Sequence, residues 1–333
     1  MEEIYELGAI TCPSGELVVL DGGHLGMWSG ERSPAEVDPG AFGVQDPAVA
    51  ADVGGARDFT ITGPDADTAA HSFGRQPGRM LHDIPASGAA RLRALFDAHC
   101  REHDFDAQLE ACAERVPHRE RVRRCAAGDG GCFLMHGVPV VALGGLPRDR
   151  ALPVLASGAG IVIPVDPAPA AKVVELGDIR VDWARLLFGD ADALNAWQHD
   201  EPVDGLADVA FWGAAEEDAA AEFGAPALGE VGEDGVRGWT GLTVPEAMRR
   251  AGALSDWKDA APGRRLMVDF RPHSHHWQVM REVRASAVES GTVEVGGARV
   301  LCTMTGQGDG RFPVSAELGP AGELVAVRVS FPS

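Results

Sequence analysis

Short runs of apolar and β-branched residues alternate with turn-forming residues along much of the chain, which is the pattern of β-strands. The predicted strands cover residues 4–10, 16–20, 59–62, 133–143, 160–165, 266–270, 292–303, 312–317 and 324–330. Two connections, at residues 135–138 and 319–322, contain the glycines that tight hairpin turns favour. The pattern therefore predicts a protein rich in antiparallel β-sheet.

Other segments have the apolar spacing of helices. The predicted helices cover residues 88–103, 107–115, 215–223, 245–251 and 274–284. In the last of these, Trp277, Met280 and Val283 share one face. Strands and helices do not alternate regularly. The sequence therefore favours an α+β fold, with mainly antiparallel sheets and packed helices, over a doubly wound parallel fold.

The two halves of the chain repeat similar motifs in the same order, which predicts an internal duplication. A first block, at constant offset, pairs residues 6–10 with 175–179, Leu17 with Leu186, Asp21 with Asp190, Leu25 with Leu194 and Trp28 with Trp197. A second block pairs Asp58 with Asp208, Gly63 with Gly213, residues 69–70 with 219–220 and residues 73–74 with 223–224. A third block pairs two Gly-Asp-Gly turns, residues 128–130 and 308–310.

The duplication predicts two related α+β domains, residues 1–158 and 159–333. The Pro-containing stretch 167–171 has the composition of a short, semi-rigid linker between the halves. Because this linker is short, we expect the two halves to pack on each other.

Composition and charge bound the possible functions. The chain has 333 residues, 45% of them hydrophobic and 24% charged, as in an ordinary globular protein. Its formal net charge of -21 opposes binding to nucleic acids and to anionic membranes. The start of the chain is acidic and lacks an apolar segment, and the six cysteines form no CxxC pair, so we expect a cytoplasmic protein with reduced thiols.

The two ends of the chain carry a family resemblance. The start, with YELG at 5–8 and PSGELV at 13–18, and the end, with GDGRFPV at 308–314 and GELV at 322–325, resemble the DUF4241 family of uncharacterised bacterial proteins. Phe312 stands where the family pattern has Tyr. The segment from RPHSHHW at 271–277 to ESG at 289–291 is similar to actinobacterial proteins of this type. The family has no established function, so the resemblance implies no catalytic residue.

Three histidines, His273, His275 and His276, with Asp269 just before them, are the best candidate metal ligands, because imidazole and carboxylate both bind zinc. Adjacent histidines diverge by about 100° on a helix, however, and the spacing of zinc ligands and the HExxH motif are both absent. We favour the alternative, in which Ser274 caps a helix and the histidines lie at the surface or against Trp277. The role of residues 80–125 stays open.

No motif for a cofactor or a nucleophile stands out. The chain has no GxxxxGK[ST] loop, no GxGxxG motif between a strand and a helix, and no GxSxG elbow. Cys12 lies in a turn, and Val181 stands at its counterpart in the second half, which favours a buried structural thiol. The two Gly-Asp-Gly segments are interpreted as structural turns. We therefore expect no cofactor.

Several tryptophans are concentrated in the second half and are large enough to anchor a core or an interface. Trp212, Trp239 and Trp277 are candidates for a partner-binding face, although a core role is favoured for them.

Three functions remain open. The favoured one is a binding protein without catalysis, such as an immunity protein or a regulatory partner, that recognises a basic protein. The second is a metal-dependent hydrolase that uses the region from His273 to His276 with a carboxylate such as Asp269 or Glu289. The third is an assembly role in which the related halves form repeating contacts. The sequence leaves the oligomeric state and the choice between enzyme and binding protein undecided.

Overall fold

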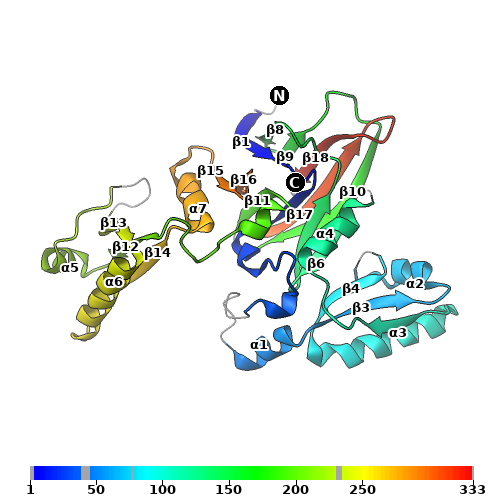
Figure 1. Cartoon of the computed structure of the whole chain (residues 1–333), viewed down its shortest axis with the longest axis horizontal. Helices are drawn as coiled ribbons and strands as arrows, with labels where there is room; N and C mark the ends of the chain where they lie inside the picture. Colours follow the sequence, from blue (N-terminus) through cyan, green and yellow to red (C-terminus); the bar gives the residue numbers. More distant parts are fainter. Residues whose placement is uncertain are drawn as a thin grey trace. The chain divides into compact units, whose positions relative to one another are not determined.

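The structure is a computed structural model that describes residues 4–38, 46–76, 78–128, 130–182, 184–229 and 235–331. It is a mixed α+β protein built from antiparallel sheets, as the sequence predicts (Figure 1). In the part of the chain that the structure describes, no helix is long and apolar enough to cross a membrane.

The order of elements is the same in both halves of the chain. The first repeat comprises β1 (Tyr5–Thr11), β2 (Leu17–Asp21), η1 (Gly22–Met27), α1 (Pro47–Gly54), β3 (Arg57–Thr62), α2 (Ala66–Phe73), β4 (Met80–Ile84), α3 (Ala89–His103), β5 (Gln108–Ala111), α4 (His118–Ala126), β6 (Gly131–Met135), β7 (Val138–Leu143), β8 (Ala151–Ser157) and β9 (Gly160–Pro164). The second comprises β10 (Lys172–Val181), β11 (Arg185–Asp190), η5 (Ala193–Ala196), β12 (Leu206–Trp212), α5 (Glu216–Phe223), β13 (Arg237–Thr243), α6 (Val244–Asp259), β14 (Met267–Pro272), α7 (His275–Ala285), β15 (Ser290–Val295), β16 (Ala298–Met304), β17 (Gly310–Leu318) and β18 (Leu324–Ser330). In the described part of the chain, α1 and the short 3-10 helices η2 (Pro34–Glu36) and η4 (Ala86–Gly88) have no counterpart.

The two repeats share both large sheets. One six-stranded sheet has the order β1-β8-β9-β18-β17-β10, and the other has the order β15-β16-β11-β2-β7-β6. Each order reads the same from either end when every strand is replaced by its counterpart. Each sheet therefore has an internal two-fold relation: three strands of one repeat lie on one side of its centre, and three strands of the other repeat lie on the other side.

Strand register places the centre of this relation at named residues. β2 and β11 pair so that Val19 lies opposite its own counterpart, Phe188. β9 and β18 pair so that Val162 lies opposite its counterpart, Arg328. Alternate residues of these strands point between the two sheets and form the main core, in which Val19, Ile163 and Phe188 are at most 1% exposed.

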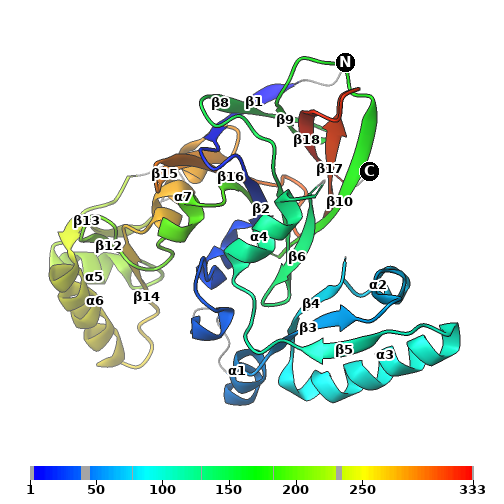
Figure 2. The same cartoon turned by 45° about the vertical axis from the view of Figure 1, so that its right-hand side comes forward.

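Each repeat also carries a smaller lobe of identical topology. The first lobe is the sheet β4-β3-β5 with α2 and α3, and the second lobe is the sheet β13-β12-β14 with α5 and α6. Apolar residues of one face of each sheet, such as Ile61 and Phe211, pack against the helices. Figure 2 shows β3, β4 and β5 beside one another with α3 along the sheet.

The chain divides into two compact units, Met1–Trp197 with Glu294–Ser333, and Gln198–Val293. This division differs from the expected one: the boundary between residues 158 and 159 lies in the turn between β8 and β9, which form one hairpin. The expected linker 167–171 lies between β9 and β10, where neither helix nor strand is found.

Two local predictions were wrong. The helix expected over 107–115 is the strand β5, because Gln108–Ala111 completes the small sheet by pairing with β3. The two Gly-Asp-Gly turns are not equivalent: Gly130 precedes β6, whereas Gly308 and Gly310 lead into β17, the counterpart of β8. Asp129 lies outside the described residues.

Candidate functional site

A buried cluster of ions joins the first lobe to α4 and to the β6–β7 hairpin. Asp83 accepts hydrogen bonds from Arg115 Nη2 at 2.7 Å and from Arg121 Nη1 at 2.8 Å. Asp58 accepts from Arg121 Nη2 at 3.1 Å and from the backbone N–H of Asp83 at 2.8 Å. All four side chains are at most 5% exposed, so two carboxylates and two guanidinium groups neutralise each other away from water.

The surroundings of this cluster favour the ionised form of Asp83 and the neutral form of the two nearby imidazoles, His82 and His136. Burial alone would raise the pKa of Asp83, but Arg121 and Arg115 outweigh burial and hold that pKa well below its usual range. Burial lowers the pKa of His82 to about 3 and that of His136 to about 4. The nearby imidazoles are therefore uncharged at neutral pH.

Two residues of the cluster have a backbone conformation that favours glycine. Asp83 has φ of 55° and His136 has φ of 49°, and their counterparts in the second repeat are Gly241 and Gly296. The left-handed conformation costs a non-glycine residue roughly 1–2 kcal/mol. An aspartate and a histidine therefore stand at these two positions although the backbone conformation there favours glycine. His136 N–H donates to Asp83 at 2.7 Å, so the two strained residues support each other.

Equivalent histidines begin α4 and α7. His118 Nδ1 accepts the N–H of Ser29 at 3.0 Å, and His275 Nδ1 accepts the N–H of Gln198 at 2.9 Å. Ser29 and Gln198 each follow one of the repeated tryptophans. Because Nδ1 accepts, a neutral imidazole carries its proton on Nε2 in both cases. Sequence comparison missed this pair, because the spacing to the tryptophan differs between the repeats.

The four candidate metal ligands of the second half have separate partners. Both ring nitrogens of His273 face carboxylates, with Nδ1 at 3.0 Å from Asp204 and Nε2 at 2.9 Å from Asp208. His276 stacks on His199 with ring centroids 4.2 Å apart, and His275 binds the backbone as described above. Asp269 accepts from Arg271 Nε at 2.7 Å. Among the described residues, no three His, Cys, Asp or Glu side chains are placed to share a metal ion.

The three candidate tryptophans are half-buried. Trp239 packs against Phe211, with ring centroids 6.0 Å apart, and under the guanidinium group of Arg250. Trp277 lies against the guanidinium groups of Arg271 and Arg284, at 4.9 and 4.5 Å. Trp239 and Trp277 thus have contacts within their own compact unit. Their use as a partner-binding face stays a prediction.

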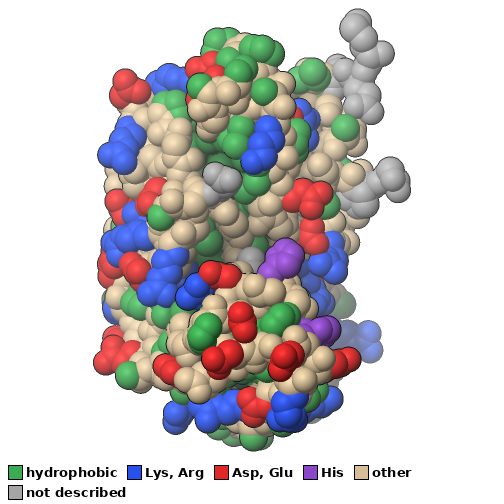
Figure 3. Space-filling view, turned by 90° about the vertical axis from the view of Figure 1, so that its right-hand side faces the viewer, with side chains coloured by type: hydrophobic (Ala, Val, Ile, Leu, Met, Phe, Trp, Pro, Cys, Tyr) green, Lys and Arg blue, Asp and Glu red, His purple; other side chains and the backbone are tan. Residues whose placement is uncertain are grey.

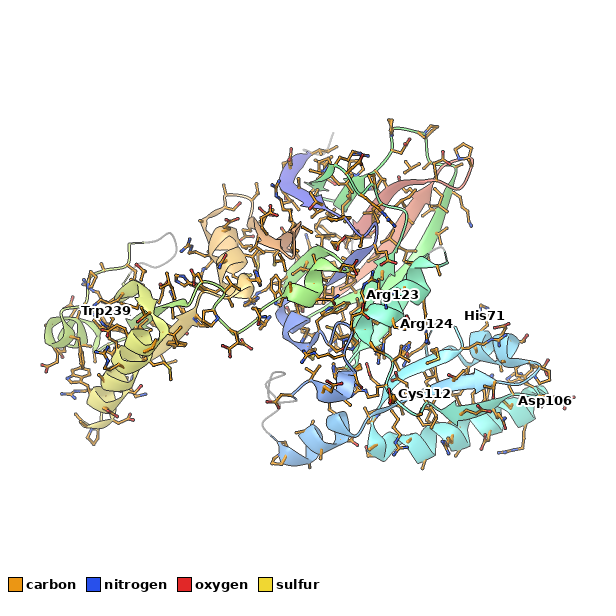
Figure 4. The ribbon with its side chains drawn as sticks, in the orientation of Figure 1. His71, Asp106, Cys112, Arg123, Arg124 and Trp239 are labelled. Atoms are coloured by element: carbon orange, nitrogen blue, oxygen red, sulfur yellow. The ribbon has the colours of Figure 1, made fainter. Side chains whose placement is uncertain are left out.

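Exposed carboxylates gather at one tip of the first lobe. The segments that follow β3 and α3 meet there: the N–H of Asp106 donates to the carboxylate of Asp65 at 2.8 Å. Glu102, Asp106 and Glu110 are exposed, and no ion pair with Lys or Arg is described for them. Figure 3 shows acidic side chains over this end of the lobe, and Figure 4 places Asp106 at its tip. We call Asp65, Glu102, Asp104, Asp106 and Glu110 the acidic tip.

Within the described residues, the second lobe differs from the first at one position of the acidic tip. Gly63 and Gly213 are counterparts with φ of 111° and 122°, and their hydrogens face the carbonyl oxygens of Asp106 and Arg265 respectively. Arg265 therefore stands where the first lobe has Asp106. The fold therefore does not require an acidic residue at the position of Asp106, whereas Asp269, the counterpart of Glu110, is acidic as well.

Comparison of the chain with family models, with curated proteins and with solved structures gives no match. The resemblance to DUF4241 stays a prediction.

Proposed function

We propose that the protein is a binding protein whose acidic tip recognises a basic protein partner, as an immunity protein or a regulatory partner would. The single observation that carries the proposal is the concentration of exposed carboxylates without basic partners on one lobe of a duplicated pair. Complementary charge steers association and is weakened by salt.

The use of arginine elsewhere in the molecule supports the proposal. Arg115 and Arg121 are buried with carboxylates, and surface arginines such as Arg79, Arg123 and Arg250 also form ion pairs with carboxylates. Many of the cations are thus satisfied internally. The excess negative charge, which gives a net charge of -21, is then carried by carboxylates that face solvent. These carboxylates raise the local concentration of a cationic partner at the surface.

The test is capture of partners from a bacterial extract on the immobilised full chain, followed by binding measurements with the purified partner. The tip variant carries Glu102→Lys and Asp106→Lys. The control carries Glu217→Lys and Glu222→Lys, which change the charge equally at exposed positions of α5 in the second lobe.

We expect the tip variant to bind at least roughly tenfold more weakly than the control, and binding of the wild type to weaken between about 0.05 M and 0.5 M NaCl. Equal loss in both variants, or binding that is indifferent to salt, would contradict the proposal.

A further inference from the structure

Strand β14 is an edge of the second lobe with unpaired backbone groups. It pairs with β12 on one side, and in the described part of the chain no strand pairs with its other side. The N–H of His273 donates to Leu206 on β12 at 3.0 Å. Because the direction of the backbone groups alternates along a strand, Val268 and Phe270 direct their N–H and C=O groups outward.

This edge is apolar where its counterpart is not. The register of each lobe aligns Met267 with Gln108 and Phe270 with Ala111. Met267 is 59% exposed and Phe270 is 37% exposed. Large exposed apolar residues on an open edge are an association surface unless charge or a covering element blocks them. The first lobe has the polar Gln108 and the small Ala111 at these two positions. The fold therefore does not require the large apolar side chains of the second lobe.

The charges on β14 are self-complementary about Phe270. An antiparallel pair of β14 strands centred on Phe270 sets Phe270 opposite its own copy and Asp269 opposite Arg271 of the second copy. A pair centred on Asp269 instead sets two carboxylates opposite each other, which is unfavourable. Of these two registers the one centred on Phe270 is favoured, because in it Asp269 of each copy faces Arg271 of the other.

The core of the molecule already uses this kind of contact. Val19 faces its counterpart Phe188, and Val162 faces its counterpart Arg328, across antiparallel pairs with a two-fold relation. A contact between identical strands has the same symmetry and closes after two copies.

We propose that β14 is a self-association edge, through which two copies of the chain pair their β14 strands about Phe270 and join two second lobes into one continuous six-stranded sheet. The second copy is the occupant because the strand is complementary to itself in charge and in apolar contact. Pro272 lacks an N–H and ends the pairing at its outer positions.

Salt separates this inference from the proposed function. Each copy carries a net charge of -21, so long-range repulsion opposes the dimer and screening by salt strengthens it. Binding of a basic partner at the acidic tip weakens with salt. The two proposals therefore succeed or fail independently.

The first experiment is sedimentation velocity of the full chain over a range of concentrations at about 0.05 M and 0.5 M NaCl. We expect a monomer–dimer equilibrium that shifts toward dimer at the higher salt. Phe270→Asp sets like charges opposite each other and raises the dissociation constant at least roughly tenfold. Val203→Asp makes the same charge change at a position that is 43% exposed and outside β14, and leaves the equilibrium unchanged.

The second experiment tests the register by mixing. Asp269→Arg alone sets Arg opposite Arg, and Arg271→Asp alone sets Asp opposite Asp, so neither variant pairs with itself. In an equimolar mixture the two chains are complementary in both rows and form a heterodimer. Circular dichroism checks that both variants are folded, and Phe270→Asp serves if either is not. A monomer under all conditions, equal effects of Phe270→Asp and Val203→Asp, or a mixture of folded variants that stays monomeric overturns the proposal.

Discussion

Asp21 and Asp190 stand at equivalent positions at the ends of β2 and β11, and each accepts a backbone N–H from the opposite repeat. Asp21 binds the N–H of Asp182, and Asp190 binds the N–H of Ser14, both at 2.8 Å. The two carboxylates are at most 1% exposed. Each repeat thus fixes the turn that joins the first two strands of the other.

We expect Asp190→Asn to destabilise the protein by about 1–3 kcal/mol, because an amide cannot accept all the hydrogen bonds that this buried carboxylate accepts. Asp190 also accepts from Ser14 Oγ at 2.6 Å and from the N–H groups of Asp192 and Ala193. The free energy of unfolding in urea measures the loss. Asp21→Asn should also destabilise the protein, and an unchanged stability in both variants would contradict an interlocking role.

Asp83→Asn should destabilise the protein by about 3–5 kcal/mol, because it leaves the buried guanidinium groups of Arg115 and Arg121 without their shared charge. The matched control is Asp67→Asn, which breaks an exposed ion pair with Arg79 and should therefore cost much less stability. Urea unfolding compares the two. Similar small losses would show that the buried cluster adds little to stability.

Stability should fall as the pH falls from about 6.5 toward 4. Burial lowers the pKa of His82 to about 3 and that of His136 to about 4. Between these values and the ordinary pKa of histidine, the unfolded chain takes up protons that the folded state refuses. Urea unfolding at about pH 7 and about pH 5 measures the loss.

The variant His136→Gly tests the cause of this pH dependence. Glycine suits the φ of 49° and stands at the equivalent position in the second repeat, as Gly296. We expect a smaller loss of stability between the two pH values than in the wild type, whereas His71→Ala, at an exposed position of α2, should behave as the wild type does. Asp58 acts in the opposite direction, because burial raises its pKa. A slope that His136→Gly leaves unchanged would assign the effect to other groups.

The histidines that begin α4 and α7 should respond alike to substitution. Asparagine places an oxygen close to the position of Nδ1, whereas glutamine extends beyond it. We therefore expect His118→Asn to be more stable than His118→Gln by about 1 kcal/mol, and the same order at His275, because only the shorter amide keeps the bond from Ser29 or Gln198. Thermal unfolding ranks the four variants, and opposite orders at the two sites would contradict their equivalence.

The repeat and the fold class could be predicted because they rest on local patterns. Asp58 and Asp208, or Gly74 and Gly224, keep their residue types since each serves the same bond or the same helix end. The shared sheets could not be predicted, because strand pairing between Val19 and Phe188 depends on contacts far apart in sequence. The strand β5 was missed for the same reason: Gln108–Ala111 is a strand only because β3 pairs with it.

Little of the candidate site could be predicted. Asp83, Arg115 and Arg121 lie in the region 80–125, which matches no motif in the second half, because these residues are what distinguishes the first repeat. The histidines at 273–276 were predicted as candidate metal ligands because they are close together in the sequence. On a helix start their rings point to different partners, so proximity in sequence was a poor guide to proximity in space.

The facing of Val19 by Phe188 has a consequence for the history of the molecule. A residue that meets its own counterpart across a two-fold is what an ancestral homodimer would have at its centre, and one repeat alone supplies only half of each large sheet. In a homodimer every substitution appears in both subunits, whereas after two gene copies are joined each repeat can change alone. The first copy now has Asp83 and His136 at positions where the second copy has Gly241 and Gly296.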